Sequence, residues 1–406
     1  MYKIFFVILF LFSLHVNANV LQKTIDNAPI GAIIKLSHGI YSGNIVINKP
    51  ITLVGQGEKT LIKGENKGSV ITINSSHVTL KNLKIIKSGN RLENFDSAIF
   101  VKDAQHINIE NCVIDESLFG IFMDSVSSSS ITKNKISSNG ESVGLRGDAI
   151  RLWFSHNNLI KNNIIKKSRD VVLMRSHNNT IEDNQIEKGR YAIYNYHSKN
   201  NKIKNNIVKD SAVGIFVQAS LDIEISKNTI KGYHGAPTSM GILLMGTSNT
   251  KVEQNILVQC NQALYIDNSP MEIDTKNWIL DNKIMYSTRG LDFRGKSLQN
   301  VIRRNTLLGN MDNIMTDSHK GRTNENDITG NYWDDYEGFD LNKDNIGDNP
   351  YKKYLYLDQL WVKNPELRFF YGSPLYSMLN FLLKLAPFME PIFVIEDKKP
   401  IFNNKF

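Results

Sequence analysis

The stretch that decides the fold is a short motif that occurs twice, 21 residues apart. Residues 155–164 read SHNNLIKNNI and residues 176–186 read SHNNTIEDNQI. Apolar and polar residues alternate there over segments of three to five positions, which is the period of short β-strands. Asparagine followed two positions later by an apolar residue then recurs every 21 to 28 residues, at Asn111, Asn134, Asn162, Asn184, Asn205, Asn228, Asn255, Asn282 and Asn305. This repeat predicts an all-β solenoid, a right-handed parallel β-helix.

In such a coil, equivalent residues of successive rungs stack about 4.8 Å apart. Stacked asparagines can bond one another through their side-chain amides, and they suit a turn that needs left-handed backbone. His156 and His177 look like a pair of metal ligands. They occupy the same turn in adjacent rungs, so stacking alone accounts for them.

The chain is expected to have three parts. Residues 1–18 are predicted to be a cleavable signal peptide, with Lys3 before a short apolar run and small residues at Val16 and Ala18. Residues 19–330 form the coil, with a helix at 19–28 capping its open end. Residues 331–406 are a loop and helical region that docks on a partner or caps the coil. The 48 basic and 40 acidic residues give a charge of +8. The basic residues are scattered, which argues against a nucleic-acid partner.

The two cysteines are predicted to be unpaired although the protein is exported. Cys112 and Cys260 lie six rungs apart in the repeat, which is nearly 30 Å at about 4.8 Å per rung. A disulfide joins Cα atoms at most about 7 Å apart.

The C-terminal region contains a loop with oxygen ligands at alternate positions. Asp340, Asn342, Asp344, the Ile346 carbonyl and Asp348 could hold calcium. Asn345 stands where a calcium loop has glycine, and it tolerates the left-handed conformation. No glutamate closes the loop, and a plain turn rich in Asp and Asn is the alternative.

Two helices are predicted after this loop, at 355–363 and from Ser373 to Ala386. In the second, Ser373 is the cap and Pro374 the first residue. Its apolar face should dock on a membrane partner, or cap the last rung, through Leu375, Met378, Leu379, Leu382 and Leu383.

Several motifs outside the repeat are more specific. They are NYWDDY at 331–336, GDNPY at 347–351, GSP at 372–374, LAPF at 385–388, GDAIRLW at 147–153, GRY at 189–191 and YIDNSP at 265–270. Their order resembles the NosD family of nitrous oxide reductase maturation proteins over almost the whole mature chain. The resemblance implies a periplasmic protein at the inner membrane that is not an enzyme. It would work with an ABC transporter permease and ATPase, a copper chaperone and nitrous oxide reductase, and handle copper as cargo for the copper–sulfur centre.

The strand alignment predicts one outward surface of interest. Strands are taken to begin at Ile150, Val172, Ile193, Ile215, Ile242 and Leu264, which point inward, as do the residues two positions later, Met174 included. The outward stripes are then Arg151, Leu173, Tyr194, Phe216, Leu243 and Tyr265, and Trp153, Arg175, Tyr196, Gln218, Met245 and Asp267. So many apolar side chains facing out indicate a partner-binding face, chiefly Tyr194, Tyr196, Phe216, Gln218, Leu243 and Tyr265.

The resemblance also bears on copper. The family carries His at the place of Tyr194 and Met at those of Tyr196 and Gln218, side chains that suit Cu(I). This chain lacks those ligands. A copper site is therefore expected to be weaker, completed by a partner, or shifted toward Met245, with His197, Met240 and His234 nearby.

Two other classes of function stay open. Parallel β-helices include polysaccharide lyases and epimerases, and Asp148, Arg151, Asp170 and Arg175 fall near one another in the repeat. Surface salt bridges account for these four residues more simply. A carbohydrate-binding surface protein is the remaining alternative.

Overall fold

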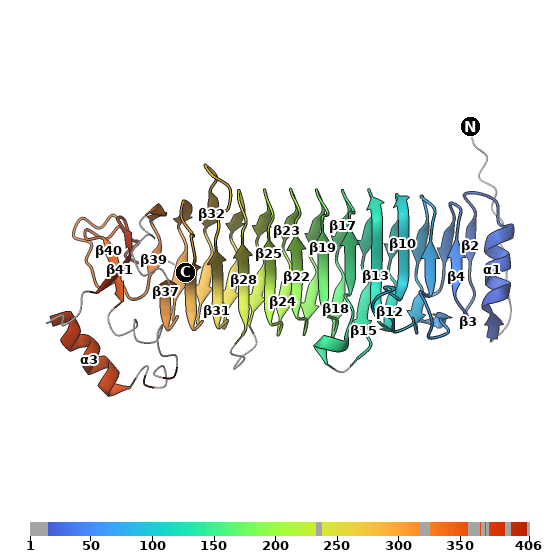
Figure 1. Cartoon of the computed structure of the whole chain (residues 1–406), viewed down its shortest axis with the longest axis horizontal. Helices are drawn as coiled ribbons and strands as arrows, with labels where there is room; N and C mark the ends of the chain where they lie inside the picture. Colours follow the sequence, from blue (N-terminus) through green and yellow to red (C-terminus); the bar gives the residue numbers. More distant parts are fainter. Residues whose placement is uncertain are drawn as a thin grey trace.

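The protein is a long rod of stacked rungs, as the computed structural model shows for residues 15–140, 142–232, 238–316, 325–355, 366, 370, 373–385 and 391–403 (Figure 1). Each rung contributes one short strand to each of three sheets, and neighbouring strands in each sheet are parallel. This confirms the right-handed parallel β-helix expected from the repeat.

We call the three sheets A, B and C. Sheet A has 14 strands: β1 (His15–Asn17), β3 (Gly39–Ser42), β6 (Thr60–Lys63), β9 (Lys84–Ile86), β12 (Val113–Ser117), β15 (Lys135–Ser138), β18 (Ile164–Lys166), β21 (Gln185–Glu187), β24 (Ile207–Lys209), β27 (Thr229–Lys231), β30 (Ile256–Val258), β33 (Lys283–Met285), β36 (Thr306–Leu308) and β39 (Tyr332–Trp333). Sheet B has 13: β2 (Ile33–Lys35), β5 (Thr52–Val54), β8 (Thr79–Lys81), β11 (Asn108–Glu110), β14 (Ser130–Thr132), β17 (Leu159–Lys161), β20 (Thr180–Glu182), β23 (Lys202–Lys204), β26 (Glu224–Ser226), β29 (Lys251–Glu253), β32 (Asn277–Leu280), β35 (Asn300–Arg303) and β38 (Asp327–Thr329).

Sheet C has 12 strands, and it carries the surface of interest. They are β4 (Ile45–Ile47), β7 (Ile71–Ile73), β10 (Ser97–Gln105), β13 (Phe119–Ser127), β16 (Ile150–Trp153), β19 (Asp170–Met174), β22 (Tyr191–Tyr196), β25 (Val213–Gln218), β28 (Met240–Met245), β31 (Gln262–Asp267), β34 (Arg289–Arg294) and β37 (Asp312–Thr316). Short 3-10 turns lie at Gly57–Lys59 and Val143–Leu145.

The interior is one continuous apolar core, because alternate residues of every strand point inward. Ile181, Ile203 and Ile225, for example, stack in successive rungs and are fully buried.

Asparagines stack beside this core as expected. Asn184 Oδ1 accepts bonds from both the backbone N–H and the side-chain amide of Asn163, each at 2.9 Å. The members of this ladder are Asn134, Asn163, Asn184, Asn206, Asn228, Asn255, Asn282, Asn305 and Asn331.

The stack differs from the expectation in one respect. Asn111, Asn162 and Asn205 are not ladder members; each has a positive φ and makes the turn just before the ladder position. The turn residue and the ladder residue are neighbours in sequence, and the repeat pattern did not distinguish between them.

Both cysteines are buried and free, which confirms the prediction. Cys112 occupies the ladder position of its rung, and its backbone N–H donates to Asn134 Oδ1 at 2.9 Å. Burial raises the pKa of each thiol to about 12, so neither reacts readily at neutral pH.

The rod is closed at both ends. Helix α1 (Ala18–Asn27) covers the first rungs with Leu21 and Ile25 buried, close to the predicted span of 19–28. At the other end the fully buried Asp397 accepts bonds from the backbone of Gly330, from Asn331 and from Trp333 Nε1.

The C-terminal region forms a stem that carries a helix. Strands β40 (Tyr351–Leu355) and β41 (Ile392–Asp397) pair antiparallel, and Trp333 stacks on Tyr351 with ring centroids 4.6 Å apart. Helix α3 (Pro374–Leu385) lies between these strands in sequence and projects at the end of the rod (Figure 1). Ser373 Oγ accepts the N–H of Tyr376 at 3.1 Å, which confirms the predicted cap. The helix predicted at 355–363 lies outside the described residues except for Leu355, the last residue of β40.

Candidate functional site

The outer face of sheet C follows the predicted register except in one rung. Val171 pairs with Ile150 and Ile193, and Leu173 pairs with Leu152, so Val171 and Leu173 point into the core. Met174 therefore faces outward, in the column of Trp153 and Tyr196, and its assignment to the core was wrong. The cause is the run of four apolar residues at 171–174, in which no alternation is visible.

Outward-facing apolar residues gather into a second cluster, separate from the core. Val213, Phe216 and Leu243 are buried in it, and Tyr191, Tyr194, Met240, Met245 and Tyr265 pack around them. The cluster spans strands β22, β25, β28 and β31. Tyr194 stacks on Phe216 at 4.9 Å and on Tyr196 at 5.7 Å between ring centroids. The residues predicted for a partner-binding face thus lie together, although Phe216 and Leu243 are more buried than expected.

A chain of polar contacts crosses this cluster. The Tyr194 hydroxyl donates to Gln218 Oε1 at 2.6 Å, and Gln218 Nε2 lies 3.7 Å from Met245 Sδ as a donor. Burial, and next the neighbouring Tyr196, raise the pKa of Tyr194 to about 12, so its hydroxyl stays protonated and can donate. These contacts hold the Met245 sulfur at the edge of the cluster.

The four residues expected near copper do not form one group. Met240 and Met245 stand at opposite ends of β28, about 17 Å apart at 3.4 Å per residue. His197 packs against Tyr196 with ring centroids 4.2 Å apart, two rungs from Met245. His234 lies outside the described residues. Met245 is thus the residue of the four whose sulfur lies within hydrogen-bond distance of Gln218.

Two groups of buried charge frame the cluster. On one side Asp148 pairs with Arg151 and Arg169, at 2.9 and 3.0 Å, and Asp170 pairs with Arg190. On the other side Asp292 pairs with Arg289 and Arg294, each at 2.8 Å. Burial raises the pKa of Asp170.

These carboxylates are fully buried, and each is paired with arginine. A buried and paired carboxylate is shielded from a substrate, which favours salt bridges over catalysis for this group. The salt bridges were expected at the surface, whereas their carboxylates are buried. Arg175 is not part of it; it lies at a turn, with its guanidinium over the Phe154 ring at 5.5 Å.

His156 and His177 stack as expected, with ring centroids 4.9 Å apart. His156 Nδ1 accepts the N–H of His177 at 3.0 Å, and His177 Nδ1 accepts the N–H of Lys199 at 2.9 Å. Each neutral ring must then carry its proton on Nε2, which leaves no free lone pair for a metal. The hydrogen bonds favour stacking over metal binding for this pair.

The loop expected to hold calcium is a network of backbone turns. Asp340 accepts the N–H groups of Asp344 and Asn345, Asp344 accepts that of Ile346, and Asp348 accepts that of Leu341. Asn342 bonds Asp344 through its side chain at 3.1 Å, and Asn345 has the expected positive φ of 69°. In the described part of the chain, no three His, Cys, Asp or Glu side chains come together as a metal site.

The apolar face of α3 is exposed to solvent. Leu375, Met378, Phe381 and Leu385 are each more than half exposed, and Leu379 and Leu382 are about two-fifths exposed. At 100° per residue these six cover an arc of about 160°. Of the five residues predicted on the docking face, only Leu383 is buried. Phe381 was missed because it lies at the border of the predicted face.

By fold, the chain is a parallel β-helix protein. It is similar to a Yersinia enterocolitica family 28 exopolygalacturonase, with a TM-score of 0.53 and 9% identity over 75% of this chain and 76% of that one. It is also similar to a mannuronic acid-specific family 6 polysaccharide lyase from human gut microbiota, with a TM-score of 0.55 and 13% identity over 79% of this chain and 86% of that one. At these identities the likeness concerns the fold alone.

Sequence comparison is more specific. The family model for NosD, described as a periplasmic copper-binding protein, matches residues 140–338. Two relatives are named as probable ABC transporter binding protein NosD. The one from Pseudomonas aeruginosa is 27% identical to this chain, over 87% of this chain and 84% of the relative. The one from Stutzerimonas stutzeri is 25% identical, over 91% of this chain and 86% of the relative. The chain is therefore similar to NosD proteins over most of its length. Among the described residues, no helix is both long and apolar enough to cross a bilayer.

Proposed function

We propose that this chain is a periplasmic accessory protein that works with an ABC transporter in the maturation of the copper–sulfur centre of nitrous oxide reductase. It would be a binding protein rather than an enzyme, exported by the signal peptide of residues 1–18 and held at the inner membrane by its partners. Residues 19–330 would be the rod and residues 331–406 the docking region, although sheet A extends by one strand beyond each boundary, with β1 before it and β39 after it. Copper would be transient cargo. The name of the matched family and those of its relatives support this assignment.

The observation that carries the proposal is that the apolar face of α3 is exposed to solvent. Asp397 and Trp333 already close the last rung, and the exposed apolar arc of α3 contributes little to that closure. An apolar arc of this size on a solvent-exposed helix is typical of a protein–protein contact. A periplasmic surface of the membrane-embedded permease is the partner we propose.

The test uses the geometry of the stem. Leu355 pairs with Ile392, so residues 356–391 can be replaced by Asn-Gly, which joins β40 to β41 as a hairpin. We expect this variant to keep the melting temperature of the full chain and to lose co-purification with the co-expressed permease and ATPase in mild detergent.

A second variant separates docking from folding within the intact chain. Leu375→Ser with Met378→Ser should weaken co-purification, while Ser377→Ala, a change at an exposed residue of the same helix, should not. If the replacement of residues 356–391 unfolds the rod, the result would show that α3 caps the coil. A folded replacement that still co-purifies would remove α3 from the interface.

A carbohydrate-binding surface is the second candidate, and the aromatic side chains on the outer face of sheet C favour it. A screen of alginate and polygalacturonate oligosaccharides by calorimetry distinguishes the two. Binding that Tyr194→Ala abolishes would favour this candidate.

Calcium binding at residues 340–348 stays a prediction. The carboxylates there already accept backbone N–H groups, so the turn needs no cation to form. A melting temperature that falls on chelation would establish structural calcium; an unchanged one would establish a turn.

A further inference from the structure

The outer face of sheet A gathers lysines that are scattered in the sequence. Five successive strands from β15 to β27, each taken with the residue that follows it, contain six lysines, two carboxylates and no arginine. The lysines are Lys135, Lys166, Lys167, Lys188, Lys209 and Lys231, and all six are exposed. The carboxylates are Glu187 and Asp210. The resulting excess of four positive charges is half of the chain's net charge of +8, and it lies within about 19 Å along the rod.

The register of the strands places lysines side by side. Lys209 and Lys231 pair in adjacent strands, with no carboxylate between them. In the turn that follows the strands, the Lys188 N–H donates to the carbonyl of Lys209 and the Lys167 N–H donates to that of Glu187, so Lys167 and Lys188 also stack in adjacent rungs. Like charges in register repel each other. This face therefore holds two stacked pairs of lysines whose repulsion an anion would relieve.

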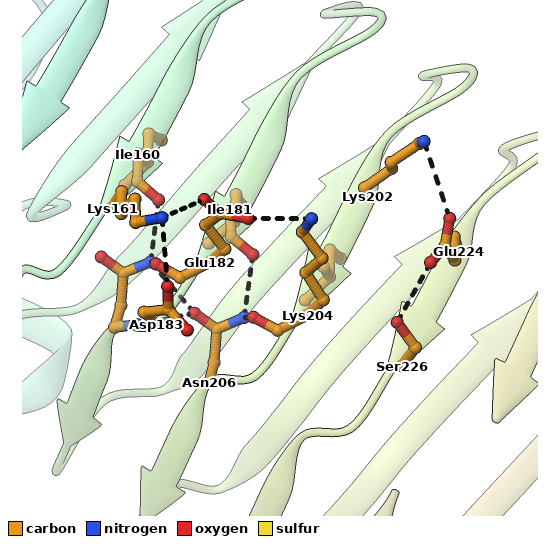
Figure 2. A network of polar contacts seen from close by, with 12 residues as sticks. Ile160, Lys161, Ile181, Glu182, Asp183, Lys202, Lys204, Asn206, Glu224 and Ser226 are labelled. Atoms are coloured by element: carbon orange, nitrogen blue, oxygen red, sulfur yellow. Dashed lines mark hydrogen bonds and ion pairs between the residues drawn. The ribbon is translucent and has the colours of Figure 1, made fainter. Parts of the chain in front are cut away.

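Sheet B balances its charges over the same rungs. Lys161 and Lys204 lie 2.7 and 2.9 Å from the carboxylate of Glu182, which stands between them (Figure 2). On sheet A, only Lys166 of the six lysines forms an ion pair with a residue that the structure describes, with Glu187 at 3.2 Å. The same coil thus pairs its lysines on one face and leaves them unbalanced on another. The unbalanced face fits an anion from outside the chain.

The side chains of this face favour a flat anionic layer over a single anionic group. Arginine has the planar fork that suits an individual carboxylate or phosphate, whereas lysine carries a point charge on a flexible stem. Ile164 and Ile207 occupy the outward position of Lys135 in later strands, and Ile207 is 41% exposed. Long lysine stems beside aliphatic side chains are typical of surfaces that meet a lipid headgroup layer.

The stem that carries α3 is anchored on the same sheet. Strand β39 is the last strand of sheet A, and its Trp333 stacks on Tyr351 of β40. In Figure 1, α3 projects below the end of the rod, toward the side on which β15, β18 and β24 lie. A helix that contacts a membrane-embedded permease from there would bring the lysines of sheet A toward the surrounding lipid.

We propose that the outer face of sheet A, from β15 to β27, binds the surface of an anionic phospholipid bilayer. A layer of anionic headgroups neutralises all six lysines together, including both stacked pairs, which a single carboxylate cannot do. The rod would then lie along the bilayer rather than stand on it. The choice of the inner membrane rests on the proposed function, whereas the lipid contact itself needs no permease.

Sedimentation with vesicles tests the contact on the purified full chain. We expect binding to vesicles made of equal parts phosphatidylcholine and phosphatidylglycerol, no binding to phosphatidylcholine alone, and release at about 0.5 M salt. Lys209→Gln with Lys231→Gln removes one stacked pair and should weaken binding at least about tenfold. The matched control is Lys202→Gln with Lys251→Gln, which removes the same charge from exposed positions on sheet B and should change binding less than about twofold.

Four results would overturn the proposal. Equal binding to both kinds of vesicle would show that anionic lipid is not recognised, and equal losses for the two lysine pairs would show that overall charge matters rather than one face. Loss of binding in Leu375→Ser with Met378→Ser, while the sheet A pair has no effect, would assign the lipid contact to α3. A sheet A pair that keeps vesicle binding but lowers co-purification with the permease would assign the lysines to an acidic protein surface. If the unaltered chain binds the anionic vesicles through sheet A and binds no permease, the proposed function fails and the lipid contact stands.

Discussion

The outer faces of sheets B and C share one core and differ in almost everything else. On sheet B, Glu182 stands between Lys161 and Lys204 of the rungs before and after it, with N–O distances of 2.7 and 2.9 Å (Figure 2). Lys202 and Glu224 continue this ladder of charge (Figure 2). On sheet C, three successive outward positions are Val172, Tyr194 and Phe216.

The difference separates the demands of folding from those of function. Both faces cover the same continuous core of inward aliphatic side chains, so that core is compatible with either surface. Alternating charges keep sheet B hydrated, and exposed pairs of this kind contribute little stability. Sheet C instead carries aromatic side chains on its outer face. A surface of this composition is typical of an interface.

The largest effect is expected from removing a side chain at the centre of the outer cluster. Phe216→Ala deletes a ring that packs on Tyr191 and Tyr194. The expected loss is about 3 kcal/mol of unfolding free energy, as for other buried phenylalanines. Lys204→Ala on sheet B is the control and should cost less than about 1 kcal/mol. Equal shifts of melting temperature for the two variants would show that the two faces contribute equally to stability.

A smaller effect is expected on copper. Met245→Ala should weaken Cu(I) binding about tenfold, which equals about 1.4 kcal/mol. Met174→Ala is a matched control, since it lies in the same outward column three rungs away. Titration against a chromogenic Cu(I) chelator measures both. Tight binding that survives Met245→Ala would place the cargo elsewhere on the rod.

A still smaller effect is expected on the charged face. Glu182→Gln should lower stability by less than about 1 kcal/mol, and 1 M salt should abolish the difference. Hydrogen bonds from Lys161 and then Lys204 hold the pKa of Glu182 below its ordinary value of 4.5. Its contribution is therefore present above pH 4.5 and is lost as pH falls through the lower folded pKa. Denaturant midpoints at pH 7 and pH 3 check this, and a difference that persists at pH 3 would contradict it.

The smallest effect is expected at the histidine stack between the two faces. Burial, followed by the charges of His156 and Lys199, lowers the pKa of His177 from 6.5. The neutral ring is favoured in the folded state, so stability should be full above pH 6.5 and decline as pH falls below it toward the folded pKa. His177→Asn should flatten this decline. A wild-type melting temperature constant between pH 7 and pH 5 would show that the stack does not titrate with folding.

The sequence predicted what is local and periodic. The coil, the cap of α3 and its apolar face follow from alternation and spacing over a few residues. The register of β19 did not, because residues 171–174 are all apolar and both phases fit. Neither did Asp397, whose bonds to Asn331 cross 66 residues that show no repeat. The distances of Met240 and His197 from Met245 were misjudged for a similar reason. Residues close in sequence can lie at opposite ends of a strand, and residues in different rungs can be well separated along the rod.

The closed ends of the rod make its length adjustable. α1 touches only the first rungs, and Asp397 only the last. A whole rung could be inserted or deleted between them without altering either closure. Each such event would move α3 relative to α1 by about 4.8 Å. The protein is in this sense a ruler, and the number of its rungs sets how far a binding surface on sheet C stands from whatever holds α3.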